Sequence, residues 1–320
     1  MNIDVSVIIV NYKTPQLLLD CVASVFKHTQ DCTFEIIIVD NHSQDNSKDL
    51  VLSHFPKVKW IDLNENLGFG IANNRGISIS KGTYTLLLNS DVELFENSIF
   101  KTIQHYQTLE FNSKKVGLLG CRILHQDGRL QPSCNYYWAG MREVIEEHPL
   151  GIKILQHWLG IRKLRDINKY ENLAKDHRIT WLGVPYALIR TELIQSYLFD
   201  ENFFMYSEDE ELNYRLSKAK YKPYFYSGTG VFHHVGGSSS NSELRNRQIY
   251  FSKLLFVFKT RGKYYFLIYC FLLRSVYKWN KKISGEDNSN YINWLDKGIK
   301  LIPFIARTNK SLNCYVKNFD

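Results

Sequence analysis

Three oxygen-bearing side chains follow a run of leucines in the stretch LLLNSDVEL at residues 86–94, at the alternate positions Asn89, Asp91 and Glu93. An unbroken apolar run is typical of a strand covered on both faces in a parallel sheet. Such sheets bind ligands just beyond the carboxyl ends of their strands, and carboxylates there suit a hard divalent cation with a phosphate as its partner. Alternatively, Asp91 and Glu93 only begin the next helix, where acids are common.

Three earlier apolar runs are predicted to be strands with the same kind of ending. The four runs lie at residues 5–10, 35–39, 58–63 and 83–88, and Asn or Asp follows each, at Asn11, Asp40, Asn64 and Asn89. Helical segments between the runs predict a parallel sheet, in which these strand ends share one edge. One such ending is ordinary turn chemistry, but four favour a binding site. Asp40 suits an N–H group of a nucleotide base, and Asp91 suits a metal-bound diphosphate.

The glycines after the third strand match no standard phosphate-binding motif. Asn73 stands where GxGxxG requires its third glycine, and GxxxxGK[ST] is absent from the sequence. Glycine at a helix start, such as Gly68, still lets backbone N–H groups approach a diphosphate. Arg75 could add a positive charge there, although an exposed helix arginine is the simpler interpretation.

The ordered segments VSVIIVNY, IIIVDNHS, NLGFGIANNRGI, LLLNSDVEL, LFDENFFMYSEDEELNYRL and FHHVGGSS resemble the family 2 glycosyltransferases with the GT-A fold, over roughly residues 4–260. The nearest subgroup resembles the rhamnosyltransferase-like enzymes of bacterial surface polysaccharide assembly. The resemblance implies an α/β fold with a Rossmann-like, mostly parallel sheet flanked by helices and a helical C-terminal extension. It implies a nucleotide-sugar-binding half at residues 1–115 and an acceptor and catalytic half at 116–244, and the composition adds a basic aromatic tail at 245–320.

The same resemblance implies residue roles. Asn89-Ser90-Asp91 stands in the place of the family's DxD motif, with Asn89 replacing the first acid, and Asp91 would hold Mn²⁺ or Mg²⁺. His234 matches a further metal ligand of some members, and Glu93 is another candidate. An imidazole beside Asp91 would make a mixed nitrogen and oxygen site that favours manganese, although paired histidines in a loop are more often simply exposed. The residues expected at the nucleotide sugar are Asn11, Asp40, Asn66, Gly68, Asn73, Arg75, Asn89 and Asp91.

Four consecutive acids at residues 208–211 crowd the first turn of a helix that is predicted to run to about residue 218. A helix N-terminus stabilises acids and lowers their pKa, whereas repulsion among four carboxylates raises it. These opposing effects do not choose among the four. The resemblance selects Asp209 as the catalytic base.

The remainder of the middle region is less informative. Residues 116–134 predict a strand and hairpin, and residues 181–190 a strand near the active site. Relatives usually carry a small Gly-Ala pair where Val184 and Pro185 stand, which leaves the donor sugar open. Residues 135–180 are predicted to form a lid or an acceptor wall, without a choice between them.

The composition predicts a folded, cytoplasmic protein with a basic end. Of 320 residues, 44% are hydrophobic and 22% charged, and the six cysteines form no CxxC pair, as in proteins with reduced thiols. The N-terminus begins directly with a strand, so no signal peptide is expected. Residues 245–320 carry a charge of +11 and the rest of the chain −3.

The basic tail interleaves cations with aromatic residues. Its longest apolar run, residues 264–273, is half the length of about 20 residues that a spanning helix needs. We therefore expect helices that lie on an anionic membrane at its inner face. Core helices with basic outer faces are the alternative, and no motif supports a nucleic-acid partner.

These observations favour an inverting, metal-dependent glycosyltransferase in which Asp209 deprotonates an acceptor hydroxyl. The expected donor is dTDP-rhamnose or a UDP-sugar, and the expected acceptor a growing lipid-linked glycan. A nucleotidyltransferase on a similar sheet is one alternative, although the phosphate loop is missing. A non-catalytic membrane-bound scaffold is another, and it leaves the strand-end acids unexplained.

Overall fold

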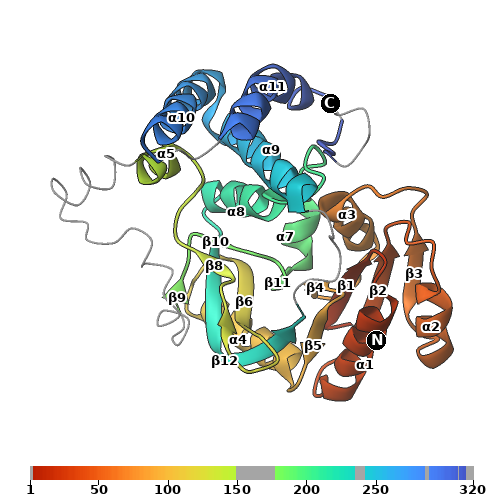
Figure 1. The fold of residues 1–320 in the computed structure, drawn as a ribbon. Coiled ribbons are helices and arrows are strands. Elements are labelled where there is room, and N and C mark those ends of the chain that lie inside the picture. Colours follow the sequence, from red (N-terminus) through yellow and green to blue (C-terminus); the bar gives the residue numbers. More distant parts are fainter. Residues whose placement is uncertain (1–2, 149–176, 235–241, 285–287, 309, 315–320) are drawn as a thin grey trace. The chain divides into compact units, whose positions relative to one another are not determined.

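A computed structural model describes residues 3–148, 177–234, 242–284, 288–308 and 310–314 (Figure 1). The chain divides into two compact units. Unit 1 is built from the segments Met1–Tyr136, Lys169–Asp200 and Asp209–Ser240, and unit 2 from Tyr137–Asn168, Glu201–Glu208 and Asn241–Asp320. The three functional stretches expected from the sequence, residues 1–115, 116–244 and 245–320, stay a prediction.

The first four strands form the parallel part of the unit 1 sheet, in the order β3-β2-β1-β4. Their bounds are Val5–Asn11 for β1, Phe34–Asp40 for β2, Lys59–Asp62 for β3 and Tyr84–Asn89 for β4. The connecting helices are α1 (Pro15–His28), α2 (Ser47–His54) and α3 (Phe69–Ile79). In the register Asn11 pairs with Asp40 and Val10 with Asn89, so the predicted strand ends do share one edge.

The sheet continues with the order β4-β11-β6-β12-β5. Strand β11 (Tyr186–Arg190) is antiparallel to β4 and to β6 (Val116–Leu124), while β12 (Lys222–His233) is parallel to β6. Strand β7 (Leu130–Gln131) completes the predicted hairpin with β6. The remaining elements of unit 1 are β8 (Cys134–Asn135), β9 (His177–Arg178), β10 (Trp181–Leu182), α4 (Ser98–Phe111), α7 (Thr191–Ser196) and α8 (Glu208–Lys218).

Two predicted segments differ in detail. The residues after Asp91 do not begin a helix, because Val92–Leu94 forms the short strand β5, which pairs with β12, and α4 starts only at Ser98. The single strand expected at 181–190 is split into β10 and β11 by the three residues 183–185. Most of the expected lid or acceptor wall, residues 149–176, lies outside the described residues, as do residues 235–239 of the HHVGGSS segment.

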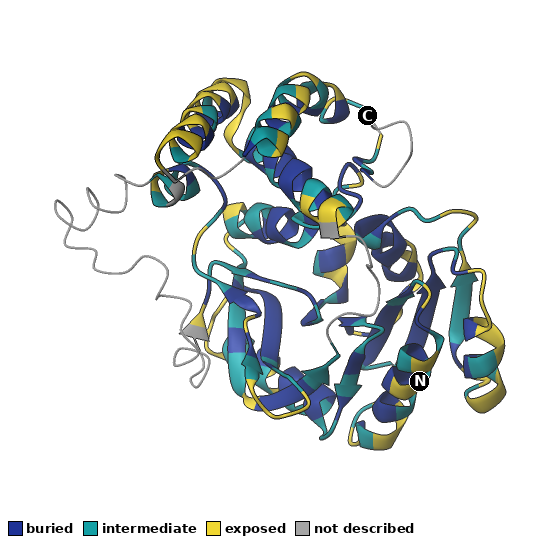
Figure 2. Ribbon diagram, viewed as in Figure 1, coloured by how far each residue is buried: buried dark blue, intermediate teal, exposed yellow. Residues whose placement is uncertain are grey.

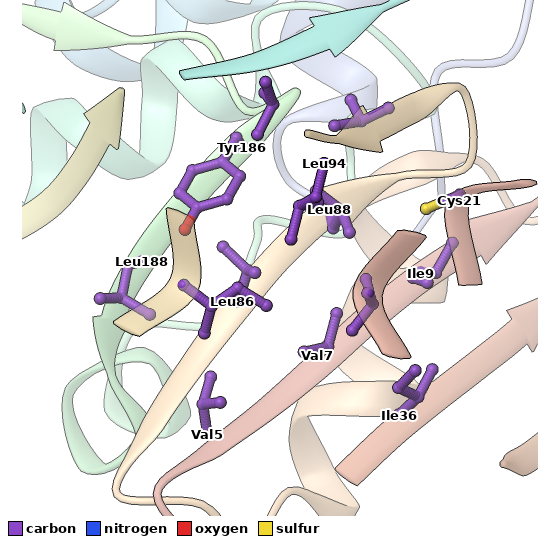
Figure 3. Close-up of a cluster of buried hydrophobic side chains, with 14 of the residues drawn as sticks. Val5, Val7, Ile9, Cys21, Ile36, Leu86, Leu88, Leu94, Tyr186 and Leu188 are labelled. Carbon is purple, nitrogen blue, oxygen red and sulfur yellow. The ribbon is translucent and has the colours of Figure 1, made fainter. Parts of the chain in front are cut away.

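Apolar side chains cover both faces of the central strands, which explains the absence of alternation in their sequences. One face buries Val7, Ile9, Leu86 and Leu88 against α1 (Figure 3). The other face buries Ile8 and Leu87 with Ile77 of α3 and with Leu212 and Leu216 of α8. A Cβ atom at Gly76 would lie 2.6 Å from Ile8 Cγ2, so glycine lets α3 pack closely on the sheet.

The helices of unit 2 are α5 (Met141–Glu147), α9 (Ser242–Arg261), α10 (Lys263–Ser284) and α11 (Ser289–Ile305). Helix α9 is their core, with Phe251, Leu254 and Phe256 fully or almost fully buried (Figure 2). Gly262, with φ of +82°, makes the turn from α9 into α10. Within the described residues, no helix is both long and apolar enough to cross a membrane.

A short segment after α11, which includes Thr308, Lys310 and Leu312 and is called here the strap, fixes the segment 201–208 within unit 2. The side chain of Asn202 donates to the carbonyl oxygens of Thr308 (2.7 Å) and Lys310 (2.8 Å). Leu312 N donates to Asn202 O at 2.8 Å, and Phe203 forms a parallel bridge with Leu312. The segment that leads into α8 is therefore held by residues far along the chain.

Candidate active site

The ends of β1 and β2 are joined by hydrogen bonds around the Asn11 amide, which is fully buried. Its Nδ2 donates to Asp40 Oδ1 (2.7 Å) and to Ser43 Oγ (3.0 Å), and its Oδ1 accepts from Thr14 Oγ1 (2.9 Å). Ser43 N donates to Asp40 Oδ2 at 2.9 Å. Since its amide is occupied by the protein, Asn11 orients Asp40, whose oxygens keep further acceptor capacity.

A second amide network ties the end of β2 to the start of α3. Asn41 Nδ2 donates to Asn66 Oδ1 at 2.8 Å, and Asn66 Oδ1 also accepts from Gly68 N at 3.0 Å. Gly68 has a φ of +86°, a conformation that glycine adopts without steric cost. This network brings Asn66 and Gly68 to the same edge as Asn11 and Asp40.

Two expected nucleotide-sugar residues lie further along α3. Asn73 is buried, and its Nδ2 donates to Phe69 O at 2.9 Å, which is a bond within its own helix. Arg75 is exposed on the same helix, as a solvated arginine would be. The structure therefore does not gather these two side chains with the residues of the strand ends.

Asn89, at the end of β4, carries an unused acceptor. Its Oδ1 is buried and accepts no hydrogen bond from the described residues. The next side chain, Ser90, lies 3.0 Å from Thr14 Oγ1 through its Oγ, so this turn is linked to the Asn11 network. A buried acceptor without a donor is unfavourable, and a bound ligand with a hydroxyl, N–H group or metal-bound water would relieve it.

The two histidines at the end of β12 contact different acids. His233 Nε2 lies 3.2 Å from Asp91 Oδ1, whereas His234 Nε2 lies 3.2 Å from Glu93 Oε2. The resemblance implied His234 as a metal ligand, and that role stays a prediction; the imidazole that lies next to Asp91 in the structure is that of His233. Successive side chains of an extended strand point to different sides, so only one of two neighbouring histidines can face Asp91.

Gln131 fixes the orientation of the His233 ring. Its Nε2 donates to His233 O at 2.8 Å, and a carbonyl oxygen can only accept, so its Oε1 is the atom that lies 2.9 Å from His233 Nδ1. His233 Nδ1 must therefore donate, which leaves a lone pair on Nε2 of the neutral ring. In the neutral ring that lone pair faces the Asp91 carboxylate, and a cation between the two acceptors would satisfy both, whereas a protonated ring would donate from Nε2 to Asp91 Oδ1.

A divalent metal fits this donor set only with help from a ligand. Among the described residues, no three His, Cys, Asp or Glu side chains gather closely enough to hold a metal ion. Magnesium-like cations are commonly held by one or two protein side chains together with substrate phosphates and water. Asp91 and His233, beside the unused acceptor of Asn89, are compatible with such a shared site.

Asp209, in the first turn of α8, has the properties of a general base. Burial raises the pKa of Asp209 to about 6, although the N–H groups of Asp209 and Glu210 act in the opposite direction. The Asp209 side chain is only partly covered, and loss of water around the carboxylate is the largest cause of its raised pKa. Of its neighbours, Glu211 is buried and occupied by an ion pair with Arg215 (2.7 Å).

The three residues between β10 and β11 connect Asp209 to the strand ends. A Cβ atom at Gly183 would lie 3.7 Å from Asp209 Oδ2, so the carboxylate faces this backbone. At the other end of the segment, Pro185 O accepts a hydrogen bond from Asn89 N at 3.0 Å. Since three residues span about 7 Å between their outer Cα atoms, Asp209 and Asn89 flank one short segment.

Asn213, one turn after Asp209, holds this arrangement together. Its fully buried amide donates to Leu182 O (3.0 Å) and Asp209 O (2.7 Å) and accepts from Leu182 N (3.3 Å). The sequence did not predict the roles of four polar residues: Asn213, Thr14, Ser43 and Gln131. No motif marks any of them, and only the fold reveals their partners.

A family model and several curated relatives match part of this chain. A family model described as "Glycosyl transferase family 2" matches residues 6–130. The chain is 25% identical over 217 residues to "N-acetylglucosaminyl-diphospho-decaprenol L-rhamnosyltransferase" of Mycobacterium tuberculosis, which covers 64% of this chain and 67% of the relative. It is 34% identical over 106 residues to "Glycosyltransferase GlyG" of Streptococcus pneumoniae, which covers 32% of this chain and 35% of that protein.

Solved structures show the same fold. The structure of Staphylococcus aureus TarS 1-349 in complex with UDP-GlcNAc has a TM-score of 0.53, with 95% of this chain and 82% of that chain covered. The sequence identity is 14%, so this likeness concerns the fold alone. It confirms the predicted α/β architecture with a mostly parallel sheet and C-terminal helices.

Proposed function

We infer that the chain is a family 2 glycosyltransferase, and we propose that it transfers a sugar from a nucleoside diphosphate to a hydroxyl group with inversion at the anomeric carbon. The observation that carries the proposal is the segment 183–185, which has Asp209 at one end and Asn89 at the other. A base that can accept a proton thereby stands beside a strand end suited to a diphosphate sugar.

In the proposed reaction, the Asp209 carboxylate takes the proton of the acceptor hydroxyl. The hydroxyl oxygen attacks the anomeric carbon while the bond from that carbon to the diphosphate oxygen breaks. The nucleoside diphosphate leaves with the bonding electron pair, and a single displacement inverts the configuration. A pKa of about 6 suits this role, because the group is ionised at neutral pH yet remains more basic than an ordinary aspartate.

The donor is held by the strand ends. Asp40, oriented by Asn11 and Ser43, is suited to accept from an N–H group of the base, and the N–H groups at the start of α3 suit the diphosphate. A divalent cation bound by Asp91 and His233 would neutralise charge on the diphosphate. The mixed nitrogen and oxygen donors favour Mn²⁺ over Mg²⁺.

We further propose a lipid-linked glycan as the acceptor and dTDP-rhamnose as the first donor to test, at the cytoplasmic face of the cell membrane. Support comes from the name of the mycobacterial relative, a rhamnosyltransferase that acts on a diphospho-decaprenol sugar. The bound UDP-GlcNAc of the TarS structure makes a UDP-sugar the alternative donor.

A panel of nucleotide sugars tests the proposal. The purified protein is incubated with dTDP-rhamnose, UDP-GlcNAc or UDP-glucose, Mn²⁺ and a sugar-diphosphate-lipid acceptor. We expect one donor to release nucleoside diphosphate with a product of opposite anomeric configuration by NMR. Release of pyrophosphate, or retained configuration, would contradict the proposed reaction.

A further inference from the structure

Helix α10 leaves one apolar face uncovered, although its other face is already packed inside unit 2. Phe266, Tyr269 and Leu273 are buried, whereas Tyr264 is 82% and Phe271 69% exposed. Figure 2 shows the exposed positions as yellow segments along this helix. The large exposed side chains of this face, called here the α10 face, are Tyr264, Leu267, Ile268, Phe271, Leu272, Trp279 and Ile283.

The α10 face lies on one side of the helix rather than as a scatter of single residues. Its first five members stand at positions i, i+3, i+4, i+7 and i+8 counted from Tyr264, and Trp279 and Ile283 follow on the same side after a gap of seven residues, over about 30 Å in all. A surface helix normally turns polar residues outward. Scattered apolar residues on a surface need no explanation, but a stripe of this length marks an interaction site.

The charges on α10 indicate what covers the face. The helix contains no Asp or Glu, and exposed lysines stand at both of its ends, at Lys263 and at Lys278, Lys281 and Lys282. Tyr264 and Trp279, which combine an apolar ring with a polar tip, lie near the same ends. Apolar side chains between cationic ends match an anionic bilayer surface, with Tyr and Trp at headgroup depth.

A second copy of the chain is a poorer match. Two α10 faces placed together in parallel would bring the three lysines at the C-terminal end of each helix against each other. The antiparallel arrangement would place Lys263 against the same lysines. With no acid on the helix, both arrangements oppose like charges in an interface of low dielectric constant.

We propose that the α10 face lies in the headgroup region of an anionic membrane, with the helix parallel to the bilayer plane. This inference rests on the proposed function, since it brings the enzyme to a lipid-linked acceptor. It also limits the expected membrane contact to a part of residues 245–320. Helix α9 is the packed centre of unit 2, so one face of α10, and not the whole basic tail, makes the contact.

The test compares vesicles of phosphatidylcholine alone with vesicles that also contain phosphatidylglycerol. We expect the full chain to cosediment with the anionic vesicles. The double variant Ile268→Ser/Phe271→Ser should bind them about tenfold more weakly, because two large apolar side chains leave the bilayer. Lys281→Ala/Lys282→Ala should lose binding to a similar extent at low salt and show a weaker salt dependence. Phe111→Ser is the matched control, since Phe111 is 89% exposed on α4 of unit 1, and its binding should equal that of the wild type.

Three outcomes would overturn the inference: equal vesicle binding by the Ile268/Phe271 variant and the wild type, no binding by the wild type, or a wild-type dimer in sedimentation velocity that this variant abolishes. Transfer to a water-soluble acceptor separates the inference from the proposed function. If the Ile268/Phe271 variant still transfers sugar to the soluble acceptor but no longer binds vesicles, both the membrane inference and the proposed function are supported. If the wild type binds vesicles but transfers to no acceptor, only the proposed function fails.

Discussion

Burial raises the pKa of Asp209 to about 6, so this carboxyl gains or loses its proton close to neutral pH. A general base acts only when deprotonated. We therefore expect kcat to be nearly constant above pH 7 and to fall about tenfold for each pH unit below 6. The measurement is a pH–rate curve with saturating donor, and an acid limb centred near pH 4 would indicate an unperturbed carboxyl instead.

Replacement of Asp209 by asparagine keeps the size of the side chain but removes its ability to take a proton. Transfer should fall by roughly two to four orders of magnitude, the usual contribution of general acid–base catalysis. Donor affinity, measured by calorimetry, should be almost unchanged. Glu208→Gln and Glu210→Gln are the neighbouring controls. If either lowers the rate of transfer more than Asp209→Asn does, that residue is the base instead.

The same substitution should stabilise the fold at neutral pH. The folded pKa of Asp209 lies above its ordinary value of 3.8, so the stability linked to its protonation is complete below about pH 4 and is lost as pH rises through 6. Asp209→Asn should therefore gain on the order of 2 kcal/mol over the wild type above pH 7, and much less at pH 4.5. Urea unfolding at both pH values measures this difference. An equal gain in stability at both would mean that the substitution acts through packing and not through ionisation.

The Gln131 contact offers a test of the metal site that does not depend on turnover. Loss of an outer partner of a metal-binding histidine typically weakens metal affinity by 10–100-fold. We expect Gln131→Leu to weaken Mn²⁺ binding in the presence of nucleoside diphosphate by about that factor, as followed by electron paramagnetic resonance. Gln126→Leu is the matched control, because Gln126 contacts His234 Nδ1 at 3.0 Å. If Gln126→Leu weakens Mn²⁺ binding more than Gln131→Leu does, the metal ligand is His234 rather than His233.

The sequence could indicate Asp40, Asn89 and Asp91, because strand ends in a parallel sheet converge by topology alone. It could not choose between His233 and His234, since that choice depends on the register of β5 against β12. The pKa of Asp209 was equally out of reach, because it results from burial by residues distant in the chain. Its assignment as the base came from resemblance and stays a prediction.

Among the helices and strands, the link between α8 and β10 can be tested with a matched pair of asparagines. Asn213 makes reciprocal bonds with the N–H and C=O groups of Leu182, and Asn74 does the same with Phe199 (both 2.9 Å). Both amides are buried, so Asn213→Ala and Asn74→Ala should each cost about 1–3 kcal/mol of stability. Urea unfolding measures this loss.

Only the Asn213 substitution should also affect transfer, because Asn213 additionally binds Asp209 O. We expect it to lower kcat, leave the donor KM almost unchanged and shift the acid limb of the pH–rate curve. Equal kinetic effects of both substitutions would mean that Asn213 acts through overall stability alone.

The apolar runs were sufficient to predict β1, β2, β3 and β4 within one or two residues, because β1, β2 and β4 are largely buried on both faces; β3, at the edge of the sheet, is only half-buried. Strand β5 was not predicted, since three residues carry too little pattern and its pairing with β12 joins segments more than 130 residues apart. The interruption between β10 and β11 also depends on tertiary contacts, namely those of Gly183 and Pro185 with Asp209 and Asn89.

Over the whole chain, the charge is concentrated in residues 245–320, with +11 there and −3 elsewhere. Attraction of this region to an anionic membrane should weaken as salt shortens the Debye length from about 10 Å at 0.1 M to about 3 Å at 1 M. We expect transfer to an acceptor in anionic vesicles to fall roughly tenfold between these salt concentrations. Transfer to a soluble acceptor is the control, and an equal decline would place the salt effect in the active site.

The composition identified the basic, aromatic end of the chain but not the surface that it presents. Helices α9 and α10 are both rich in aromatic residues and cations, and only the structure shows that α9 is enclosed while α10 is half uncovered. For the same reason, deletion of residues 263–320 is a poor test of membrane binding. It would expose Phe251 and Leu254 of α9, so point substitutions on α10 are preferable.

The strap after α11 also sets an order of events during synthesis. Asn202 receives its partners from Thr308 and Lys310, which are translated 106 and 108 residues later. At about 5–20 residues per second, the ribosome needs roughly 5–20 seconds to add that length. The peptide that leads into Asp209 is thus made early and waits for its partners until α9, α10 and α11 have been translated. A nascent chain that already contains Asp209 is therefore expected to lack the ordered approach to α8 until the strap has emerged.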